Sequence, residues 1–492
     1  MIDQLPVLQV LLPLLAAPLC VLLRRRVPVT ALALAACWGS FAVAIGLLQR
    51  VLAEGVVVYE MGAWSAPWGI EYRVDLLSAF VLLFVSGIGA LVLTYAPKSL
   101  TAEIPADRLH FFYTLYLLCL TGLLGITITG DLFNLFVFLE VSSLSSYGLI
   151  SLGRNRQALT AAFRYLIMGT IGATFILIGV GLMYQMTGTL NMADMVQRIA
   201  DREALRTVRV AFAFLTVGIG LKMALFPLHQ WLPDAYAHAP STVSAFIAAT
   251  STKVSVYILL RFVFTIYGVE FAFANLHIER FLIPLSLAAM FLASAAAIYQ
   301  TDLKRLLAYS SVAQVGYMTL GASFASVEGL TASIAHLFNH ALTKGGMFLA
   351  VGCLVYRIGR TSLANLEGIG RRMPWTTFAW VLGGLGLIGV PGTAGFVSKW
   401  YLLEAALGAG AWPLALAILL SSLLAVIYIW KVIEVAYFRL PQTRTSQAVE
   451  APAVLLLPTW LLIGASLYFG FRATFSADLA RQAAEALLQG MP

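Results

Sequence analysis

The sequence has very few charged residues, and it contains no polar linker. Asp, Glu, Lys and Arg make up only 11% of the 492 residues, against about 25% in an ordinary soluble domain. Hydrophobic residues make up 60%, and the mean hydropathy is +0.88. A soluble core stops growing near about 250–300 residues, so a longer soluble chain divides into domains joined by polar segments. These absences exclude a soluble enzyme and a disordered scaffold, and they predict a helical protein that crosses a membrane many times.

Cysteine is also scarce. The four cysteines, Cys20, Cys37, Cys119 and Cys353, lie inside apolar segments, and no CxxC pair occurs. This pattern indicates small core residues, and it disfavours a disulfide framework or a metal site. The net charge is +8, but the cations lie in short loops and form no stripe alternating with aromatic residues. Nucleic-acid binding is therefore not expected.

Apolar runs predict about fourteen membrane-spanning helices, since one span needs about 20 residues. The runs cover residues 5–23, 29–50, 74–95, 111–129, 132–152, 161–186, 207–227, 241–264, 281–299, 305–323, 329–356, 376–396, 411–437 and 453–471. The first run precedes its arginines, which is typical of a retained span and not of a signal peptide. Arginine and lysine gather in alternate loops, so those loops are expected inside and both termini outside. Residues 192–206 and 476–488 are predicted to form amphipathic surface helices.

Several charged residues lie where an apolar run should have none. Glu140, Lys222 and Lys253 are deep within their runs, and Lys399 follows a predicted helix break. Each charge at the centre of a bilayer costs about 2.5–3.5 kcal/mol on insertion scales. These groups are therefore expected to face one another or water, and to mark a path for protons. Arg261 lies near the end of its run, where its side chain is expected to reach the headgroups.

Two of the runs contain helix-breaking residues beside a lysine. Pro227 and Pro233, in FPLHQWLP, follow Lys222, and the pair Pro391-Gly392, in GVPGTAGFVSKW, precedes Lys399. Proline removes an amide donor and kinks a helix. Irregular backbone at membrane depth is tolerated only beside protein or a water-filled cavity. Helix breaks are therefore predicted at all four residues, and two such spans suggest an internal inverted repeat.

Two histidines share one helical face with a lysine, because His336, His340 and Lys344 are spaced four residues apart. Three interpretations are open. The histidines could bind zinc, although Leu337 stands where an HExxH site has its glutamate; they could be buried and bonded to backbone; or they could form a hydrated proton relay. No metal site is predicted. Polar residues of the preceding span either line the same channel or serve helix packing: Tyr309, Ser310, Ser311 and Gln314.

We hypothesise that Glu140 pairs with Lys222. Opening the pair would release the Lys222 proton toward the centre of the protein, and closing it would reload the lysine. The predicted proton pathway consists of Glu140, Lys222, Lys253, His229, His336, His340, Lys344 and Lys399.

The segments that carry these residues resemble a known family. GDLFNLFVFLEVSSLSSYGLI, TGTLNMADM, GLKMALFPLHQWLPDAYAHAPSTVSAFIAA, HLFNHALTKGGMFL and GVPGTAGFVSKW are similar to segments of the antiporter-like subunits of Mrp Na+/H+ antiporters, respiratory complex I and membrane-bound hydrogenases. The resemblance covers about residues 70–470. It implies an all-α polytopic fold of fourteen helices, with two inverted five-helix repeats and discontinuous helices 7 and 12.

The resemblance also implies a division of the chain and a set of roles. Residues 1–492 form one transmembrane domain: helices 1–3 in 1–110, a first repeat of helices 4–8 in 111–264, a second repeat of helices 9–13 in 281–437, helix 14 in 453–471, and a surface helix in 476–488. Glu140 and Lys222 match the gating ion pair and Lys253 matches the central lysine. His336 matches the histidine of helix 11, and Lys399 matches the terminal lysine.

Lys399 looks more like the corresponding lysine of the D-type subunit of Mrp antiporters and of one complex I branch. The segments FLEVSSLSSY and TGTLNMADM look closer to the D-type subunit than to complex I subunits. The expected function is thus proton translocation in a Na+/H+ antiporter. One alternative is a proton-pumping subunit of a complex I-type NADH:quinone oxidoreductase or a membrane-bound hydrogenase; another is a stand-alone or structural membrane subunit. The chain has no flavin, haem or Fe–S ligand set, so no cofactor is expected in it. The expected partners are other membrane subunits, the lipid bilayer and H+ in the inner membrane of a prokaryote. Sodium transport by this chain stays open, because no hard-cation ligand cluster stands out.

Overall fold

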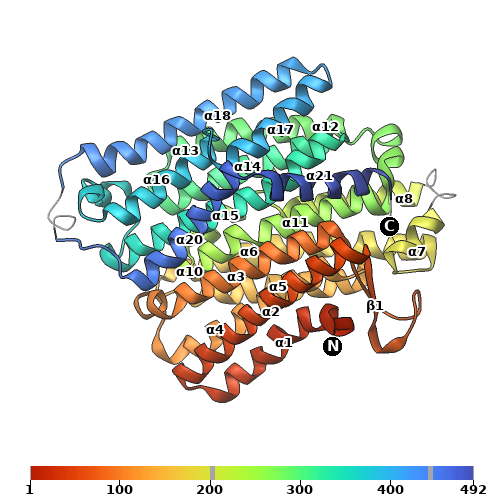
Figure 1. The fold of residues 1–492 in the computed structure, drawn as a ribbon, viewed down its shortest axis with the longest axis horizontal. Coiled ribbons are helices and arrows are strands. Elements are labelled where there is room, and N and C mark those ends of the chain that lie inside the picture. The colour runs from red at the N-terminus through yellow and green to blue at the C-terminus, as the bar shows by residue number, and fades with distance from the viewer. Residues whose placement is uncertain (1, 200–205, 442–446, 491–492) are drawn as a thin grey trace.

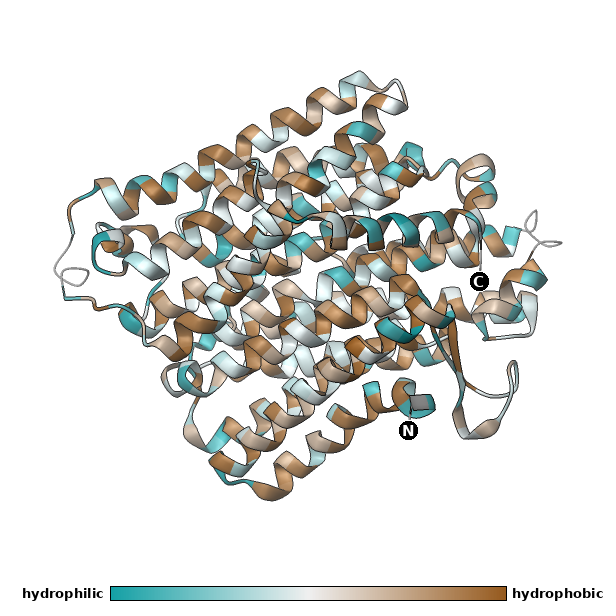
Figure 2. Cartoon of the chain, in the orientation of Figure 1, coloured by the Kyte–Doolittle hydropathy of each residue, from teal (hydrophilic) through white to brown (hydrophobic). Residues whose placement is uncertain are grey.

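The computed structural model describes residues 2–199, 206–441 and 447–490. Long helices lie side by side in one bundle, and the hairpin strand β1 and helix α7 lie at the same end of it (Figure 1). Hydrophobic residues dominate the long helices, while hydrophilic residues gather toward their ends (Figure 2). We call the end that carries β1 and α7 the hairpin end; the loop charges predict that it faces outward.

The N-terminal half of the chain supplies eleven α-helices in its described part. They are α1 (Leu5–Leu23), α2 (Arg26–Glu54), α3 (Leu76–Glu103), α4 (Leu109–Ile128), α5 (Leu132–Ser151), α6 (Arg156–Thr187), α7 (Met192–Ile199), α8 (Arg206–Lys222), α9 (Trp231–His238), α10 (Ser241–Ala249) and α11 (Ser251–Leu260). The 3-10 segments of this half are η1 (Ile2–Gln4), η2 (Met61–Ala63) and η3 (Ala106–Arg108), and its π-helical segments are η4 (Arg261–Ile266) and η5 (Glu270–Asn275).

The C-terminal half continues with nine further α-helices in its described part. They are α12 (Glu279–Ala288), α13 (Ser294–Tyr299), α14 (Leu303–Ser323), α15 (Val327–Ile358), α16 (Pro374–Ile388), α17 (Ala394–Gly408), α18 (Trp412–Ile433), α20 (Ala453–Phe471) and α21 (Thr474–Leu488). The 3-10 segments here are η7 (Leu363–Leu366) and η8 (Ile369–Arg371), and the π-helical segments are η6 (Ala289–Ala293) and η9 (Glu434–Phe438).

Eleven helical stretches of the described residues are long and apolar enough to cross a membrane. Helix occupies every predicted run, and three runs fall outside these eleven: 207–227, 305–323 and 376–396. In the first and third the helix breaks, with α8 ending at Lys222 and α16 at Ile388. In the second, α14 is continuous but carries several serines, a glutamine and two cations. The polytopic helical fold is confirmed, while the count of fourteen stays a prediction.

A small β-hairpin departs from the all-helical prediction. Strands β1 (Val57–Glu60) and β2 (Glu71–Val74) pair antiparallel, with Val57 opposite Val74. Both strands contain valine and tyrosine, which favour extended backbone, but four residues are too few for a search based on long apolar runs. The hairpin matters because β2 leads directly into α3 and positions Arg73 and Asp75.

Of the two predicted amphipathic helices, the tail helix is present and the other is present in part. Residues 192–199 form α7, residues 200–205 lie outside the described residues, and residue 206 begins α8. The tail helix α21 packs its alanine- and leucine-rich face against α15 and α3. On its exposed face, Arg481 and Glu485 form an ion pair of 3.1 Å.

One pattern of backbone pairing occurs in both halves. Asp131 caps α5 and Asp302 caps α14, each accepting a hydrogen bond from the amide three residues later. Beside each cap, two reciprocal hydrogen bonds join the chain to the segment after the next long helix: Leu132 N–H to Leu190 O, Met192 N–H to Gly130 O, Leu303 N–H to Thr361 O and Leu363 N–H to Thr301 O. Corresponding residues in the two sets are separated by the same number of positions. The intervening helices α6 and α15 have equal lengths of 32 residues.

The close approach of α16 and α17 gives a direct stability test. A Cβ atom added at Gly395 would lie 1.9 Å from the carbonyl oxygen of Gly386, whereas one added at Gly408 of the same helix would meet nothing within 4 Å. We expect Gly395→Ala to destabilise the protein by about 1–3 kcal/mol, because backbone must move to relieve the clash. Gly408→Ala should be neutral or slightly stabilising. Melting temperatures of the purified variants in detergent would measure the difference. Equal melting temperatures would contradict the close approach of Gly395 to the Gly386 carbonyl.

Candidate functional site

The predicted ion pair between Glu140 of α5 and Lys222 of α8 is present. Lys222 Nζ lies 3.3 Å from Glu140 Oε1 and also donates to Ser143 Oγ at 2.8 Å. The lysine side chain is 5% exposed and the glutamate side chain is 25% exposed. Glu140 therefore joins the buried lysine to the protein surface. Ser143 lies one helical turn after Glu140, so both oxygens face the same ammonium.

Helix α8 ends at Lys222, at the predicted break. Ala224 adopts a left-handed conformation with φ of 58°, and Pro227 follows in the non-helical segment before α9. The Trp231 indole donates to the Leu221 carbonyl across the break at 2.9 Å, and its ring stacks on Tyr165 with centroids 3.9 Å apart. The freed carbonyl is thus satisfied inside protein, as irregular backbone at membrane depth requires.

Lys253 lies at a second interruption, which sequence analysis did not predict. The span from 241 to 266 breaks at Thr250, between α10 and α11, and Lys253 Nζ donates to the Ala248 carbonyl and to Thr252 Oγ1. No proline or glycine marks this break. The signal available was the run Thr250-Ser251-Thr252, whose hydroxyl groups compete with helical hydrogen bonds.

His336 of α15 connects two further helices. Its Nδ1 lies 2.7 Å from Ser398 Oγ of α17, and its Nε2 lies 2.8 Å from Gln314 Oε1 of α14. The two hydrogen bonds link α15 to both α14 and α17. This result confirms that Gln314 lines the same polar region as His336.

His340 and Lys344 continue the same face of α15. The rings of His336 and His340 stack with centroids 5.7 Å apart. Both ring nitrogens of His340 are buried and have no hydrogen-bond partner among the described protein groups, so the site suits a water-mediated relay. Lys344 Nζ donates to the Leu307 carbonyl at 2.7 Å and to Ser310 Oγ. Lys253 is near enough to interact electrostatically with all three side chains.

Lys399 of α17 caps the end of the other broken helix. Its Nζ donates to the carbonyls of Leu387 and Ile388 at 2.8 and 3.0 Å, and to Ser422 Oγ at 3.0 Å. It also lies 4.5 Å from the centre of the Tyr317 ring. A cation at the C-terminal end of a helix is favourable, because the last carbonyls are unpaired and point toward it.

One of these predictions needs correction. Pro233 does not break a helix, since it lies in the first turn of α9 (Trp231–His238), where proline fits because no intrahelical amide donor is needed. His229 lies in the first break, packed beside Phe226 and Tyr309. Its Nδ1 is buried without a hydrogen-bond partner among the described residues, so its place in the pathway stays a prediction. The other seven predicted pathway residues form two groups. One is the Glu140–Lys222 pair, and the other is the cluster of Lys253, His336, His340, Lys344 and Lys399. Sequence analysis did not predict four further residues of these groups: Ser143, Ser398, Ser422 and Tyr317.

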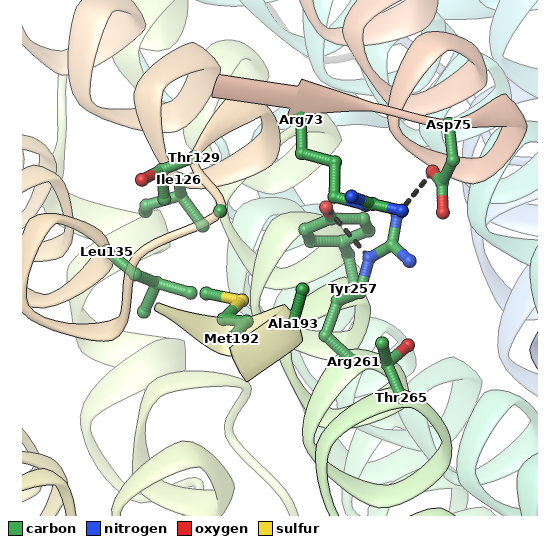
Figure 3. A pocket seen from close by; sticks show the side chains of 11 residues that line it. Arg73, Asp75, Ile126, Thr129, Leu135, Met192, Ala193, Tyr257, Arg261 and Thr265 are labelled. Atoms are coloured by element: carbon green, nitrogen blue, oxygen red, sulfur yellow. Dashed lines mark hydrogen bonds and ion pairs between the residues drawn. The ribbon is translucent and has the colours of Figure 1, made fainter. Parts of the chain in front are cut away.

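Arg261 also differs from expectation, because it is buried and does not reach the headgroups. It pairs with Asp75, which directly precedes α3 and is far from Arg261 in the sequence. The two side chains line a cavity at the hairpin end (Figure 3). Burial alone would raise the pKa of Asp75, but the Arg261 guanidinium and the hydrogen bonds from Ser78 outweigh it and lower the pKa below its usual value.

Comparison with known proteins gives consistent matches. The family model for the NADH:quinone oxidoreductase/Mrp antiporter transmembrane region matches residues 129–425. The N-type subunit of the NADH-quinone oxidoreductase of Desulforudis audaxviator is 42% identical over 477 residues, covering 94% of each chain. The D-type subunit of the Na+/H+ antiporter of Alkalihalophilus pseudofirmus is 30% identical and covers 92% of this chain and 90% of that one. The structure of the Mrp complex from Dietzia sp. DQ12-45-1b contains a chain that is 27% identical, with a TM-score of 0.91 and coverage of 100% and 98%.

The closure of the first break can be tested through Trp231. Trp231→Phe keeps an aromatic ring on Tyr165 but removes the hydrogen bond to the Leu221 carbonyl. We expect a loss of about 0.5–1.5 kcal/mol of stability, because the buried Leu221 carbonyl loses one of its two donors and keeps only the Ala224 amide at 3.2 Å. Trp412→Phe is the matched control, since Trp412 is exposed. Thermal unfolding in detergent would compare them, and an unchanged Trp231→Phe protein would contradict this role.

Proposed function

Because the chain belongs to the NADH:quinone oxidoreductase/Mrp antiporter transmembrane family, we propose that it translocates protons as part of a multisubunit membrane complex. Its role is that of the D-type subunit in an Mrp-type Na+/H+ antiporter. The observation that carries the proposal is the Glu140–Lys222 pair, set beside a buried group of lysines and histidines. Intramembrane ionisable groups of this kind serve ion and proton pathways.

The type of oxygen that accepts from each lysine ammonium indicates the order of the proton path. Lys222 is held by a carboxylate, while Lys253, Lys344 and Lys399 are held by carbonyl and hydroxyl oxygens. A lysine paired with an anion keeps its proton, and separation from Glu140 makes Lys222 release it. The proton then passes by way of Lys253 and His340 toward His336 and Lys399. His229 belongs to this path only if water connects it.

The two halves are assigned as inverted repeats, covering about residues 111–264 and 281–437. The repeated caps of α5 and α14, with their matching backbone bridges, support this division. We place the protein in the inner membrane of a prokaryote with both termini outside, because the inner loops hold most of the arginine and lysine. Lipid covers its exposed apolar faces.

A second candidate is favoured by one observation. The 42% identity to the N-type subunit of an NADH-quinone oxidoreductase exceeds the 30% identity to the D-type subunit of an antiporter. In that case the chain pumps protons for a redox complex whose cofactors lie in other subunits. A purely structural role is disfavoured, since structure alone does not require charges buried at this cost. Any Na+ exchange is assigned to the whole complex.

Mass spectrometry of the complex purified in mild detergent separates the two candidates. Co-purification with several small membrane subunits, and with no redox protein, supports the antiporter. Co-purification with Fe–S, flavin or Ni–Fe proteins makes the chain the proton-pumping part of a redox enzyme. Purification of the chain alone would contradict both.

Glu140→Gln tests the gate. The change keeps the shape of the side chain but removes the charge that holds the Lys222 proton, so we expect at least a ~10-fold loss of proton transport, as for loss of a charge-assisted interaction. Glu328→Gln is the control, because Glu328 is exposed at the start of α15. Proton uptake into vesicles that contain the complex would measure both. Normal transport by the Glu140→Gln complex would overturn the gating role.

A further inference from the structure

Two cavities in the N-terminal half share one wall. The first, which we call the lysine cavity, is lined by Lys222 and by the hydroxyl groups of Ser143, Ser146, Ser251 and Ser255. It is polar and has room for water. The second, the hairpin cavity, contains Arg73, Asp75, Thr129, Arg261 and Thr265 (Figure 3). Ile126 of α4 lines both.

Apolar side chains lie where the two cavities approach each other. Ile126 lines both cavities, and Ile258 of α11 lines the lysine cavity. Its neighbour Tyr257 already lines the hairpin cavity. The serine-bearing face of α11 that begins at Ser251 therefore leads toward Arg261, with an interruption of about one helical turn.

A network of hydrogen bonds fastens this boundary from the hairpin side. The Arg261 guanidinium pairs with Asp75, donates to Ser78 Oγ at 2.8 Å, and donates from Nε to the Tyr257 hydroxyl at 3.0 Å. The Tyr257 hydroxyl donates in turn to the Thr127 carbonyl at 2.9 Å. The network joins the start of α3, the end of α4 and the body of α11.

Stability alone does not explain an ion pair at this place, with the Arg261 side chain 10% exposed and the Asp75 side chain 23% exposed. Replacing a buried ion pair by apolar residues is often neutral or stabilising, while a pair whose partners can separate makes a two-state element. The pair lines the hairpin cavity, and that cavity shares the lining residue Ile126 with the cavity that contains Lys222.

We propose that the Asp75–Arg261 pair is a gate on a second proton passage, which runs from the lysine cavity to the hairpin end and is closed in this structure. The inference rests on the proposed function, in which Lys222 exchanges protons. The Lys222 ammonium gives its proton to water in the lysine cavity, forming hydronium. When Arg261 moves away from Asp75, water enters between the two cavities and carries the proton to the hairpin end. Lys222 is left neutral, and Asp75 keeps its charge throughout, because its part is to hold Arg261 in the closed state.

Passive proton flux tests the gate. The complete complex is reconstituted in liposomes with a trapped pH dye, and a potassium diffusion potential is set with valinomycin. Asp75→Asn retains an oxygen that can cap α3 but removes the charge that holds Arg261. We expect passive proton flux to rise about tenfold. The closed state loses one charge-assisted hydrogen bond, and this shifts the equilibrium toward the open state by about that factor. Asp194→Asn is the control, because it breaks the nearby Asp194–Arg198 pair of α7 without touching the cavity boundary.

Two further variants decide the route. Ser255→Leu, added to Asp75→Asn, fills the lysine cavity and should return the flux to the wild-type value. Ile126→Ala leaves the ion pair intact and should raise the flux by itself, which keeps the test valid if Asp75→Asn does not assemble. A folded Asp75→Asn complex without extra flux, or a flux that persists with Ser255→Leu, overturns the proposal.

The assay also separates this inference from the function on which it rests. Passive flux needs neither a sodium gradient nor a redox substrate. A wild-type complex that shows no antiport and no coupled pumping would contradict the proposed function, while an Asp75→Asn leak in the same liposomes would still establish the gate.

Discussion

The cost of placing an ammonium group inside a membrane protein governs this structure. Each buried lysine must find oxygen atoms, and in a continuous helix the backbone oxygens are already used. For two of its buried lysines the chain provides them by interrupting its helices. Lys253 bonds to the Ala248 carbonyl at the α10–α11 interruption, and Lys399 bonds to the last carbonyls of α16. For these two lysines the helix break and the buried charge are thus one feature, while Lys344 bonds to the Leu307 carbonyl of the continuous helix α14.

Lys222 is the exception that gives the group a direction. Its oxygen partners are a serine hydroxyl and the Glu140 carboxylate, and that carboxylate is itself partly exposed. A neutral carbonyl stabilises an ammonium weakly, while a carboxylate stabilises it strongly and can be moved or neutralised. The charge that is easiest to switch therefore lies at one end of the group, next to the protein surface.

The two halves of the bundle also meet at α9. Asp234 of that helix accepts from Arg164 of α6 at 2.8 Å and from Arg305 of α14 at 2.9 Å. The Lys304 ammonium donates to the Ala239 carbonyl just beyond the helix. The segment that follows the Lys222 break is thus fastened to both halves, so a change at the ion pair has a physical route to α14 and α15.

Sequence reasoning found the deep charges because an apolar run makes each of them conspicuous. It also found the breaks at Pro227 and Pro391, since proline acts locally. It missed the break at Thr250, which no proline or glycine marks. It also predicted a break at Pro233, but this proline lies in the first turn of α9, where proline does not interrupt a helix. It expected Arg261 to reach the membrane surface because the partner, Asp75, belongs to another helix. Partners of this kind depend on tertiary packing, which a single sequence does not display.

A double-mutant cycle on proton transport tests the central claim most directly. Glu140→Gln, Lys222→Gln and the double variant would be compared in vesicles containing the complex. If the two residues act as one gate, the double variant loses no more transport than either single variant, since groups that act as a unit are not additive. Losses that multiply in the double variant would show independent roles and would contradict the account.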